Sequence, residues 1–266
     1  MVRIGIAGCG TIGAAVARAI ATGQISALLA GLHNRTPSRA EALARSLAPT
    51  PPILALDPLV RASDLVVEAA TGPALAAIVP ACLREGKDVF VISVGGLLDH
   101  EEWFRQAEER GVRILIASGA IAGLDGLRGA AVGRIESVTL TTKKPPRGLA
   151  GAPYVTEHRL NLDVLTEETL IFDGTAREAC RGFPTNVNVS AALSLAGIGP
   201  DQTRVRIFAV PDGRFNQHYI EIRGEFGRLS IEIENVPSPT NPRTGLLSIY
   251  SSIAMLADYA RGWRKN

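Results

Sequence analysis

Short apolar runs alternate with segments of helical periodicity along the first 117 residues of the chain. The apolar runs contain few polar residues, which is typical of parallel strands buried on both faces. They predict strands at residues 2–7, 25–32, 64–70, 88–94 and 112–117. The intervening segments predict helices at 12–23, 37–47, 73–83 and 98–110. We therefore expect an α/β fold built on a Rossmann-type parallel sheet.

The pattern changes beyond about residue 130. Strand-like segments lie at 136–142, 203–210, 215–224 and 228–236, and the last two predict a hairpin through 225–227. We expect a loop at 143–148, a helix at 186–196, a proline-marked linker at 237–242 and an amphipathic helix at 245–263. This organisation predicts a dinucleotide-binding domain at 1–120, joined by a C-terminal helix at 240–266 that packs back on it, and a second α+β domain at 121–239.

Composition narrows the class of protein. The 28 basic and 26 acidic residues are mixed along the chain, so we expect no basic stripe and no nucleic-acid partner. No apolar run approaches the roughly 20 residues of a membrane span, and the chain enters a predicted strand at once, so we expect a cytoplasmic protein. The three cysteines are widely spaced, which favours a reducing compartment and no metal site.

The sequence Gly-Cys-Gly-Thr-Ile-Gly at residues 8–13 links the first predicted strand to the first predicted helix. Its three glycines match a dinucleotide loop, which needs a tight turn, close approach of the backbone to pyrophosphate, and a helix packed on the strand. Glycine turns also serve structural ends, but the strand before and the helix after favour a cofactor site. The expected contacts are Gly8, Gly10, Thr11, Ile12 and Gly13.

An NAD-specific site would carry a carboxylate about 20 residues beyond this loop, to bind the ribose hydroxyls. Here the sequence is His-Asn-Arg-Thr at 33–36. Arg35 is a candidate partner for the 2′-phosphate of NADP, with Asn34 as a neighbouring hydrogen-bond donor. We expect NADP to be accepted at least comparably to NAD. The alternative is that Arg35 is a solvated loop residue.

Two further turns follow predicted strands, where open α/β sheets bind their ligands. Ala70 lies in the first turn and Ser93 in the second, and small residues there would let a ring or ribose approach the backbone. Ordinary tight turns would have the same composition. We keep both residues as candidate cofactor contacts.

Among the four histidines, His218 is the strongest candidate for proton transfer. Strand alternation places it on one face with Ile220 and Ile222, where partial burial would disfavour the charged imidazole. A packing role is the alternative. His33, His100 and His158 lie in less suitable positions.

Anion recognition needs a cation, and the chain offers candidates near the predicted loop at 143–148. These are Lys143, Lys144, Arg147 and Arg159, which would otherwise form a solvated basic loop. Asn186 and Asn188 stand near a predicted helix start, either as caps or as amides for nicotinamide or substrate.

In combination, several segments make the sequence resemble the L-aspartate dehydrogenase family over nearly its whole length. They lie at 8–13, 93–97, 118–123, 183–188, 218 and 241–246. The resemblance implies that His218 is the catalytic histidine and that Ala122 and Asn188 contact the cofactor. It also implies use of NAD or NADP, a homodimer or higher homo-oligomer, and a link to NAD biosynthesis through iminoaspartate.

The reaction implied is hydride loss from L-aspartate to give iminoaspartate, which is hydrolysed to oxaloacetate and ammonia. One alternative is a related reductase, such as a homoserine dehydrogenase or a dihydrodipicolinate reductase. The latter would show paired histidines followed by a lysine, and the sequence contains no such segment. The other alternative is a sensor that binds NAD(P)H without turnover, although no basic helix precedes the first strand.

Overall fold

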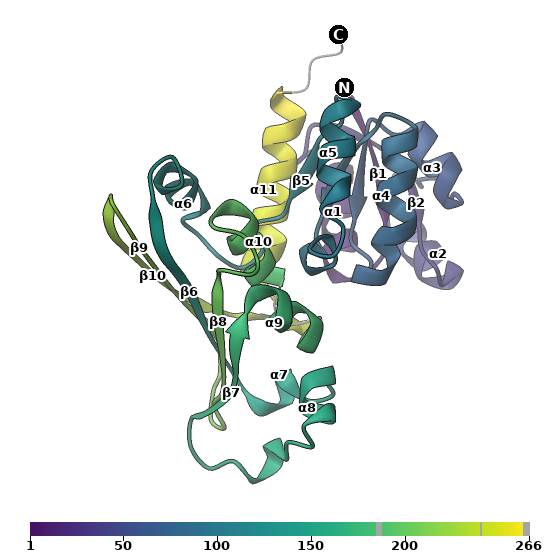
Figure 1. The fold of residues 1–266 in the computed structure, drawn as a ribbon. Helices are drawn as coiled ribbons and strands as arrows, with labels where there is room; N and C mark the ends of the chain where they lie inside the picture. Colours follow the sequence, from purple (N-terminus) through teal and green to yellow (C-terminus); the bar gives the residue numbers. More distant parts are fainter. Residues whose placement is uncertain (185–187, 240, 263–266) are drawn as a thin grey trace. The chain divides into compact units, whose positions relative to one another are not determined.

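The structure is a computed structural model that describes residues 1–184, 188–239 and 241–262, without the side chains of 242 and 243. The chain forms two compact units (Figure 1). The first unit comprises Met1–Ala117 and the chain from Ile249 onward, and the second comprises Ser118–Ser248. None of the described helices is both long and apolar enough to cross a membrane.

The first unit is built on a five-stranded, fully parallel sheet in the order β2-β1-β3-β4-β5. Its strands are β1 (Val2–Ala7), β2 (Ala27–His33), β3 (Leu65–Glu68), β4 (Asp88–Val91) and β5 (Ile114–Ile116). All residues of β3 and β4 are buried, which explains their uninterrupted apolar sequence. The predicted Rossmann-type sheet is confirmed.

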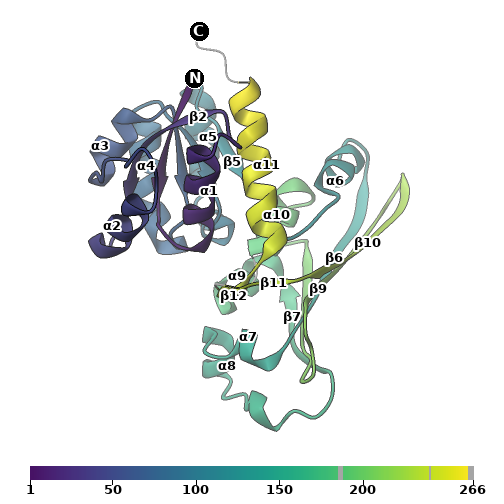
Figure 2. The same ribbon diagram turned by 180° about the vertical axis from the view of Figure 1, so that it is seen from behind.

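Helices lie on both faces of this sheet, as Figures 1 and 2 show from opposite sides. They are α1 (Thr11–Ala21), α2 (Pro37–Arg45), α3 (Leu56–Ala62), α4 (Leu75–Arg84) and α5 (Glu102–Glu109), with short 3-10 turns at Gly72–Ala74 and Val94–Leu97. One core cluster joins α1 and α2 to the sheet through residues such as Val16 and Leu43. Helix α3 was not predicted from the sequence, because its seven residues are too few to show a periodicity.

The C-terminal helix α11 (Leu246–Gly262) completes the core of the first unit. Leu256 is fully buried in the same cluster as α1. The Tyr259 hydroxyl donates to an oxygen of Asp88 at 2.8 Å, and the Arg113 guanidinium lies 4.8 Å from the centre of the Tyr259 ring. The predicted return of this helix to the first half is confirmed.

The second unit is built on a mixed five-stranded sheet in the order β10-β9-β6-β8-β7. Only β6 and β8 pair in parallel. Its strands are β6 (Ile135–Lys144), β7 (Thr169–Thr175), β8 (Arg204–Ala209), β9 (Asn216–Gly224) and β10 (Gly227–Asn235). Gly224 pairs with Gly227 at the turn, which confirms the predicted hairpin.

Helices cover one face of this second sheet and leave the other without a helix layer (Figures 1 and 2). They are α6 (Leu124–Ala130), α7 (Pro146–Leu149), α8 (Pro153–Glu157), α9 (Ala176–Gly182) and α10 (Asn188–Ala196), with a 3-10 turn at Leu162–Val164. The predicted helix at 186–196 is described from Asn188 onward. Residues 185–187, 240 and 263–266 lie outside the described residues, and with them the candidate Asn186 and the end of the predicted C-terminal helix.

Two local predictions for the second unit are wrong. Residues 143 and 144 are not a loop but the last two residues of β6, where Lys144 pairs with Ala209 of β8. The expected linker at 237–242 contains β11 (Pro237–Ser238) and the first residues of β12 (Asn241–Gly245), and these two strands pair antiparallel. In both places, pairing with a distant strand overrides a local composition of lysine and proline.

Candidate active site

The glycine loop of the first unit is closely packed at two of its three glycines. A Cβ on Gly8, whose φ is +113°, would lie 2.3 Å from the carbonyl oxygen of Ala69. A Cβ on Gly13 would lie 1.9 Å from the carbonyl oxygen of Gly8, because the first turns of α1 pack directly on the loop. Glycine is therefore required at both positions for the strand, loop and helix to pack.

The middle glycine differs, because a Cβ on Gly10 would meet no atom within 4 Å. Gly10 is the N-cap of α1, has an extended backbone, and makes no side-chain cap for the helix. Thr11 and Ile12, the first helical residues, thus present backbone N–H groups beside open space. Such a helix start fits the pyrophosphate of a dinucleotide, which can approach only where no side chain intervenes.

The ends of β1, β2 and β3 lie along one edge of the sheet, since Ala7 pairs with both His33 and Glu68. The Asn34 side chain joins two of these ends by accepting a hydrogen bond from the Cys9 N–H at 2.9 Å. Its amide nitrogen donates to the carbonyl of Thr36 at 2.9 Å. Asn34 therefore shapes the loop.

Arg35 is exposed, and its guanidinium forms no ion pair with the described residues. It lies two residues after β2, near the position that a ribose-binding carboxylate would occupy in an NAD-specific site. The side chain is therefore accessible to a phosphate.

Glu68 ends β3 and is fully buried. Its carboxylate accepts hydrogen bonds from the N–H groups of Ala70, Ile92 and Ser93 at 2.8, 3.2 and 2.9 Å, and from the Ser93 hydroxyl at 2.9 Å. Burial raises the pKa of this carboxyl, while the hydrogen bonds act in the opposite direction. Glu68 thus fixes the two turns that carry the predicted contacts Ala70 and Ser93. Because the Ser93 hydroxyl donates its proton to Glu68, that proton does not serve a ligand.

The remaining predicted cofactor contacts belong to the second unit. Ala122 is exposed and precedes Gly123, which has a left-handed backbone and is the N-cap of α6. Asn188 is half-buried at the start of α10. The segment before Ala122 lies against this helix, because a Cβ on Gly119 would lie 3.5 Å from Val189.

His218 lies in the middle of the second unit and is 3% exposed. Its Nδ1 is 3.0 Å from the hydroxyl oxygen of Thr142, its direct cross-strand neighbour on β6. Among the described residues this is the one hydrogen bond of the imidazole, so Nε2 is the nitrogen available to a ligand. Burial lowers the pKa of His218 to about 3, and the charge of Lys144 contributes in the same direction. The ring is therefore neutral at physiological pH, as a proton acceptor must be.

The other histidines occupy more exposed positions. His33 contacts the carbonyl of Leu54 through Nδ1 at 3.0 Å. His100 stacks on Trp103 and His158 stacks on Tyr154, each with ring centres 3.9 Å apart. His158 is exposed in the turn that follows α8.

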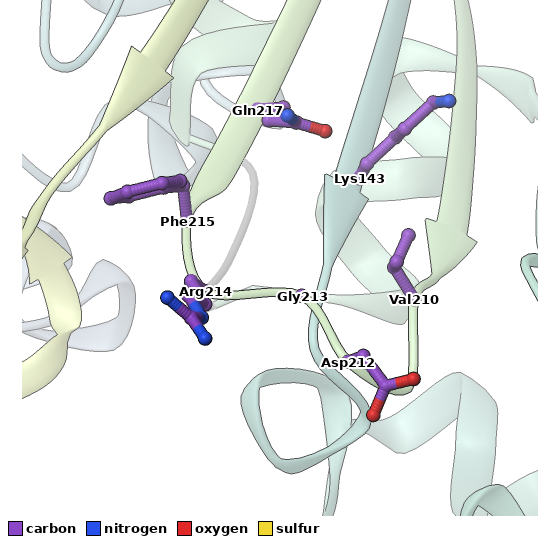
Figure 3. Close-up of a pocket in the computed structure, with 7 residues that line it drawn as sticks. All are labelled: Lys143, Val210, Asp212, Gly213, Arg214, Phe215 and Gln217. Carbon is purple, nitrogen blue, oxygen red and sulfur yellow. The ribbon is translucent and has the colours of Figure 1, made fainter.

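A hollow of about 270 Å³ lies in the second unit (Figure 3). Lys143 and Gln217 line it as cross-strand partners, and each alternates along its strand with buried residues of the His218 face. The connection from Val210 to Phe215 forms the rest of its wall. Strand alternation thus turns Lys143 and Gln217 away from the face that carries His218, so the hollow is separate from the histidine. Lys143 also pairs with Glu168 at 2.8 Å.

Two family models match successive parts of the chain. Residues 8–117 match the family model described as homoserine dehydrogenase, NAD binding domain, and residues 125–259 match aspartate dehydrogenase, C-terminal. The L-aspartate dehydrogenase of Methanosarcina acetivorans is 45% identical over 260 residues, which cover 96% of each chain. That of Bradyrhizobium diazoefficiens is 44% identical over 96% of this chain and 90% of its own. The chain belongs to the L-aspartate dehydrogenase family.

Solved structures support the same fold for this member of the aspartate dehydrogenase family. The crystal structure of aspartate dehydrogenase from Thermotoga maritima superposes with a TM-score of 0.77 at 24% identity and covers both chains completely. A putative myo-inositol dehydrogenase from Sinorhizobium meliloti gives 0.55 at 17% identity, over 100% of this chain and 91% of its own.

Two polar residues of this aspartate dehydrogenase family member were missed by the sequence interpretation. Glu68 lay inside a predicted strand with no partner assigned, yet an acid in an apolar run is a signal, since a buried carboxylate needs several donors. Thr142 ended a predicted strand, and only the register of β6 with β9 places it opposite His218.

Proposed function

We propose that this chain is an NAD(P)-dependent L-aspartate dehydrogenase. In the proposed reaction L-aspartate loses a hydride to give iminoaspartate, which water converts to oxaloacetate and ammonia; reductive amination of oxaloacetate is the reverse. The observation that carries the proposal is the 45% identity to a relative of that name over 96% of the chain. The buried His218–Thr142 pair supports it, because it supplies a neutral base in the half that matches the aspartate dehydrogenase model.

In this proposal the first unit binds the cofactor and the second holds the substrate. Gly8, Gly10 and Gly13, with the first N–H groups of α1, would hold the pyrophosphate. Ala70 and Ser93, fixed by Glu68, would line the neighbouring part of the same edge. Ala122 and Asn188 are further proposed contacts, on the strength of the resemblance. When bound, the nicotinamide accepts the hydride that leaves Cα of aspartate.

His218 is the proposed catalytic residue. Thr142 holds the imidazole through Nδ1, so proton transfer occurs at Nε2. The proton comes from the substrate ammonium or from the water that attacks the imine carbon, since either step needs a neutral base within hydrogen-bond reach. Burial keeps the ring neutral and excludes bulk water from it.

We also propose that NADP is accepted at least comparably to NAD. No carboxylate follows β2 to repel a 2′-phosphate, and the exposed Arg35 can pair with one. Asn34 holds the backbone of the glycine loop and of the turn after β2 by its hydrogen bonds with Cys9 and Thr36.

The remaining proposals concern assembly and cellular role. A homodimer or higher homo-oligomer is proposed, and the sheet face without helices in the second unit is the surface that supports it, with Tyr219 38% exposed there. We further propose a cytoplasmic location and a supply of iminoaspartate to NAD biosynthesis, both on the ground of family resemblance.

A parallel assay tests the proposed function. Purified protein is mixed with oxaloacetate and ammonia, with NADH and NADPH in separate reactions, and the absorbance of the reduced nicotinamide is followed. The expected result is consumption of both cofactors, and formation of reduced cofactor in the reverse assay with L-aspartate. Activity with homoserine but not with aspartate would overturn the proposal in favour of a related reductase. Tight NADPH binding with no turnover of any amino acid or oxoacid would indicate a sensor.

A further inference from the structure

The buried face of the second sheet changes from apolar to polar along its length. On β6 the buried side chains are Val138, Leu140, Thr142 and Lys144 in that order. The first three pair with Ile222, Ile220 and His218 of β9, and Asn216 lies two residues before His218 on the same face of β9. These four residues of β9 are also buried. Burying polar groups together costs free energy of folding unless they form hydrogen bonds or ion pairs with one another or with a ligand.

Lys144 is the cation of this polar end. Its side chain is 6% exposed, and it stands two residues beyond Thr142 on the same face of β6. Because Thr142 is directly opposite His218, Lys144 is the diagonal neighbour of the imidazole, roughly 7–8 Å away between Cα atoms. The charge of Lys144 reaches His218, since it is one of the two causes that lower the pKa of the imidazole.

We propose that the Lys144 ammonium binds a carboxylate of the substrate next to His218. This inference rests on the proposed function and names the residue through which the site recognises a dicarboxylic amino acid. L-aspartate brings two negative charges, and a neutral histidine cannot balance either of them. A buried ammonium pairs strongly with a carboxylate, because little water screens the two charges.

The protonation behaviour of Lys144 supports the proposal. Burial lowers the pKa of its ammonium to about 8, so the group is desolvated but still mainly charged at neutral pH. A bound carboxylate favours the charged ammonium. It also offsets the positive charge that disfavours protonation of His218, so the imidazole becomes more basic when substrate is present.

The other cations suggested by the sequence are less well placed. Lys143 faces the opposite side of the sheet, lines the hollow of Figure 3 and pairs with Glu168. Arg147 is exposed on α7, and Arg159 is exposed in a loop. Of these four candidates, only Lys144 shares the buried face with His218.

Lys144→Met tests the proposal, with Lys143→Met as a matched control on the neighbouring residue. The probe is succinate, a dicarboxylate that cannot be oxidised at an amine, titrated calorimetrically into each variant saturated with NAD. We expect Lys144→Met to weaken succinate binding and raise the KM for aspartate about 30-fold or more, with the KM for NAD unchanged. Lys143→Met should match the wild type.

Lys144→Arg separates charge from shape, because it keeps the cation and should retain succinate binding to within about tenfold. Equal weakening in the Met and Arg variants, or unchanged binding in Lys144→Met, overturns the proposal. If Lys144→Met does not unfold cooperatively, Lys144→Gln replaces it with the same expected loss. Because succinate binding is independent of turnover, a wild-type protein that binds succinate but does not oxidise aspartate would contradict the proposed function and not the role of Lys144.

Discussion

The two sheets of this protein present functional groups in opposite ways. At the edge of the first sheet the proposed cofactor site is made from loops, backbone N–H groups and glycines that lack a side chain. On the second sheet the proposed chemistry uses side chains within strands, where Thr142 and Lys144 of β6 lie beside His218 of β9. One site depends on the absence of side chains, and the other depends on the register between two strands.

This difference separates binding from chemistry. A nucleotide shared by many enzymes can be held by backbone groups that any sequence provides, given glycine where a Cβ would clash. Substrate binding and proton transfer need particular side chains at particular register positions of a sheet. Substitutions in the two units are therefore expected to change different measured quantities.

The largest expected effect is that of His218→Asn. An amide of similar size preserves packing but cannot take up a proton, so kcat with aspartate should fall about 10³-fold. The dissociation constant of NADH, measured by fluorescence titration, should stay within a factor of about two if binding and chemistry are separate. His158→Asn is the matched control, since this exposed histidine belongs to the same unit. Near wild-type turnover in a folded His218→Asn protein would remove the catalytic assignment.

The converse variant is Gly10→Ala in the first unit. The added methyl group meets no protein atom and the backbone of Gly10 is extended, so the melting temperature should not change by more than a degree or two. The methyl group would occupy the space that pyrophosphate needs, and the KM for NAD should rise about tenfold or more. Gly129→Ala, in equally open space in α6, should leave the KM for NAD unchanged and raise the melting temperature slightly, because alanine favours a helix interior. An unchanged cofactor KM in Gly10→Ala would mean that the pyrophosphate does not approach this glycine.

The same contrast explains what the sequence could and could not predict. The first sheet was predictable, because buried parallel strands are continuous apolar runs and the glycine loop is local in sequence. In the second unit β7 and α9 were not predicted, although Thr175 and Glu178 form a capping box whose spacing is a signal for a helix start.

The candidate site shows a similar division. His218 and its buried face were predicted from alternation alone, and the structure confirms that burial. The burial of Lys144 was not predicted from the sequence, because two lysines followed by two prolines have the composition of an exposed loop. Only pairing with β8 extends β6 to Lys144, and that contact is 65 residues away in the chain. Long-range register cannot be read from local composition.

The buried imidazole also predicts how stability depends on pH. The pKa of His218 is about 3 in the folded protein and near 6.5 in an unfolded chain, so between these values the unfolded state binds more protons. Stability should therefore fall as pH drops from about 6.5 towards 3, by at most about 1.4 kcal/mol per pH unit from this group. Denaturant unfolding of wild type and His218→Asn at pH 7 and pH 5 measures the difference. Equal pH dependence in the two proteins would show that His218 titrates normally when folded.

The smallest expected effect concerns Arg35, which would bind the cofactor through its side chain and not through the backbone. Elsewhere on the proposed cofactor edge the backbone makes the contacts, but discrimination between NADP and NAD needs a charge that recognises the extra phosphate. Arg35 is exposed, and solvent screens its interaction, so its contribution should be roughly 1 kcal/mol. Arg35→Ala should therefore raise the KM for NADPH about fivefold while the KM for NADH stays constant.

Arg45→Ala is the control, because Arg45 lies at the far end of α2 and contacts Glu41 of the same helix. Raising the salt concentration should shrink the difference between wild type and Arg35→Ala, since an exposed ion pair is screened. If Arg35→Ala leaves both KM values unchanged, Arg35 is a solvated loop residue, and acceptance of NADP follows from the missing carboxylate alone. Either result decides whether side-chain recognition operates in the first unit or is confined to the sheet that carries His218.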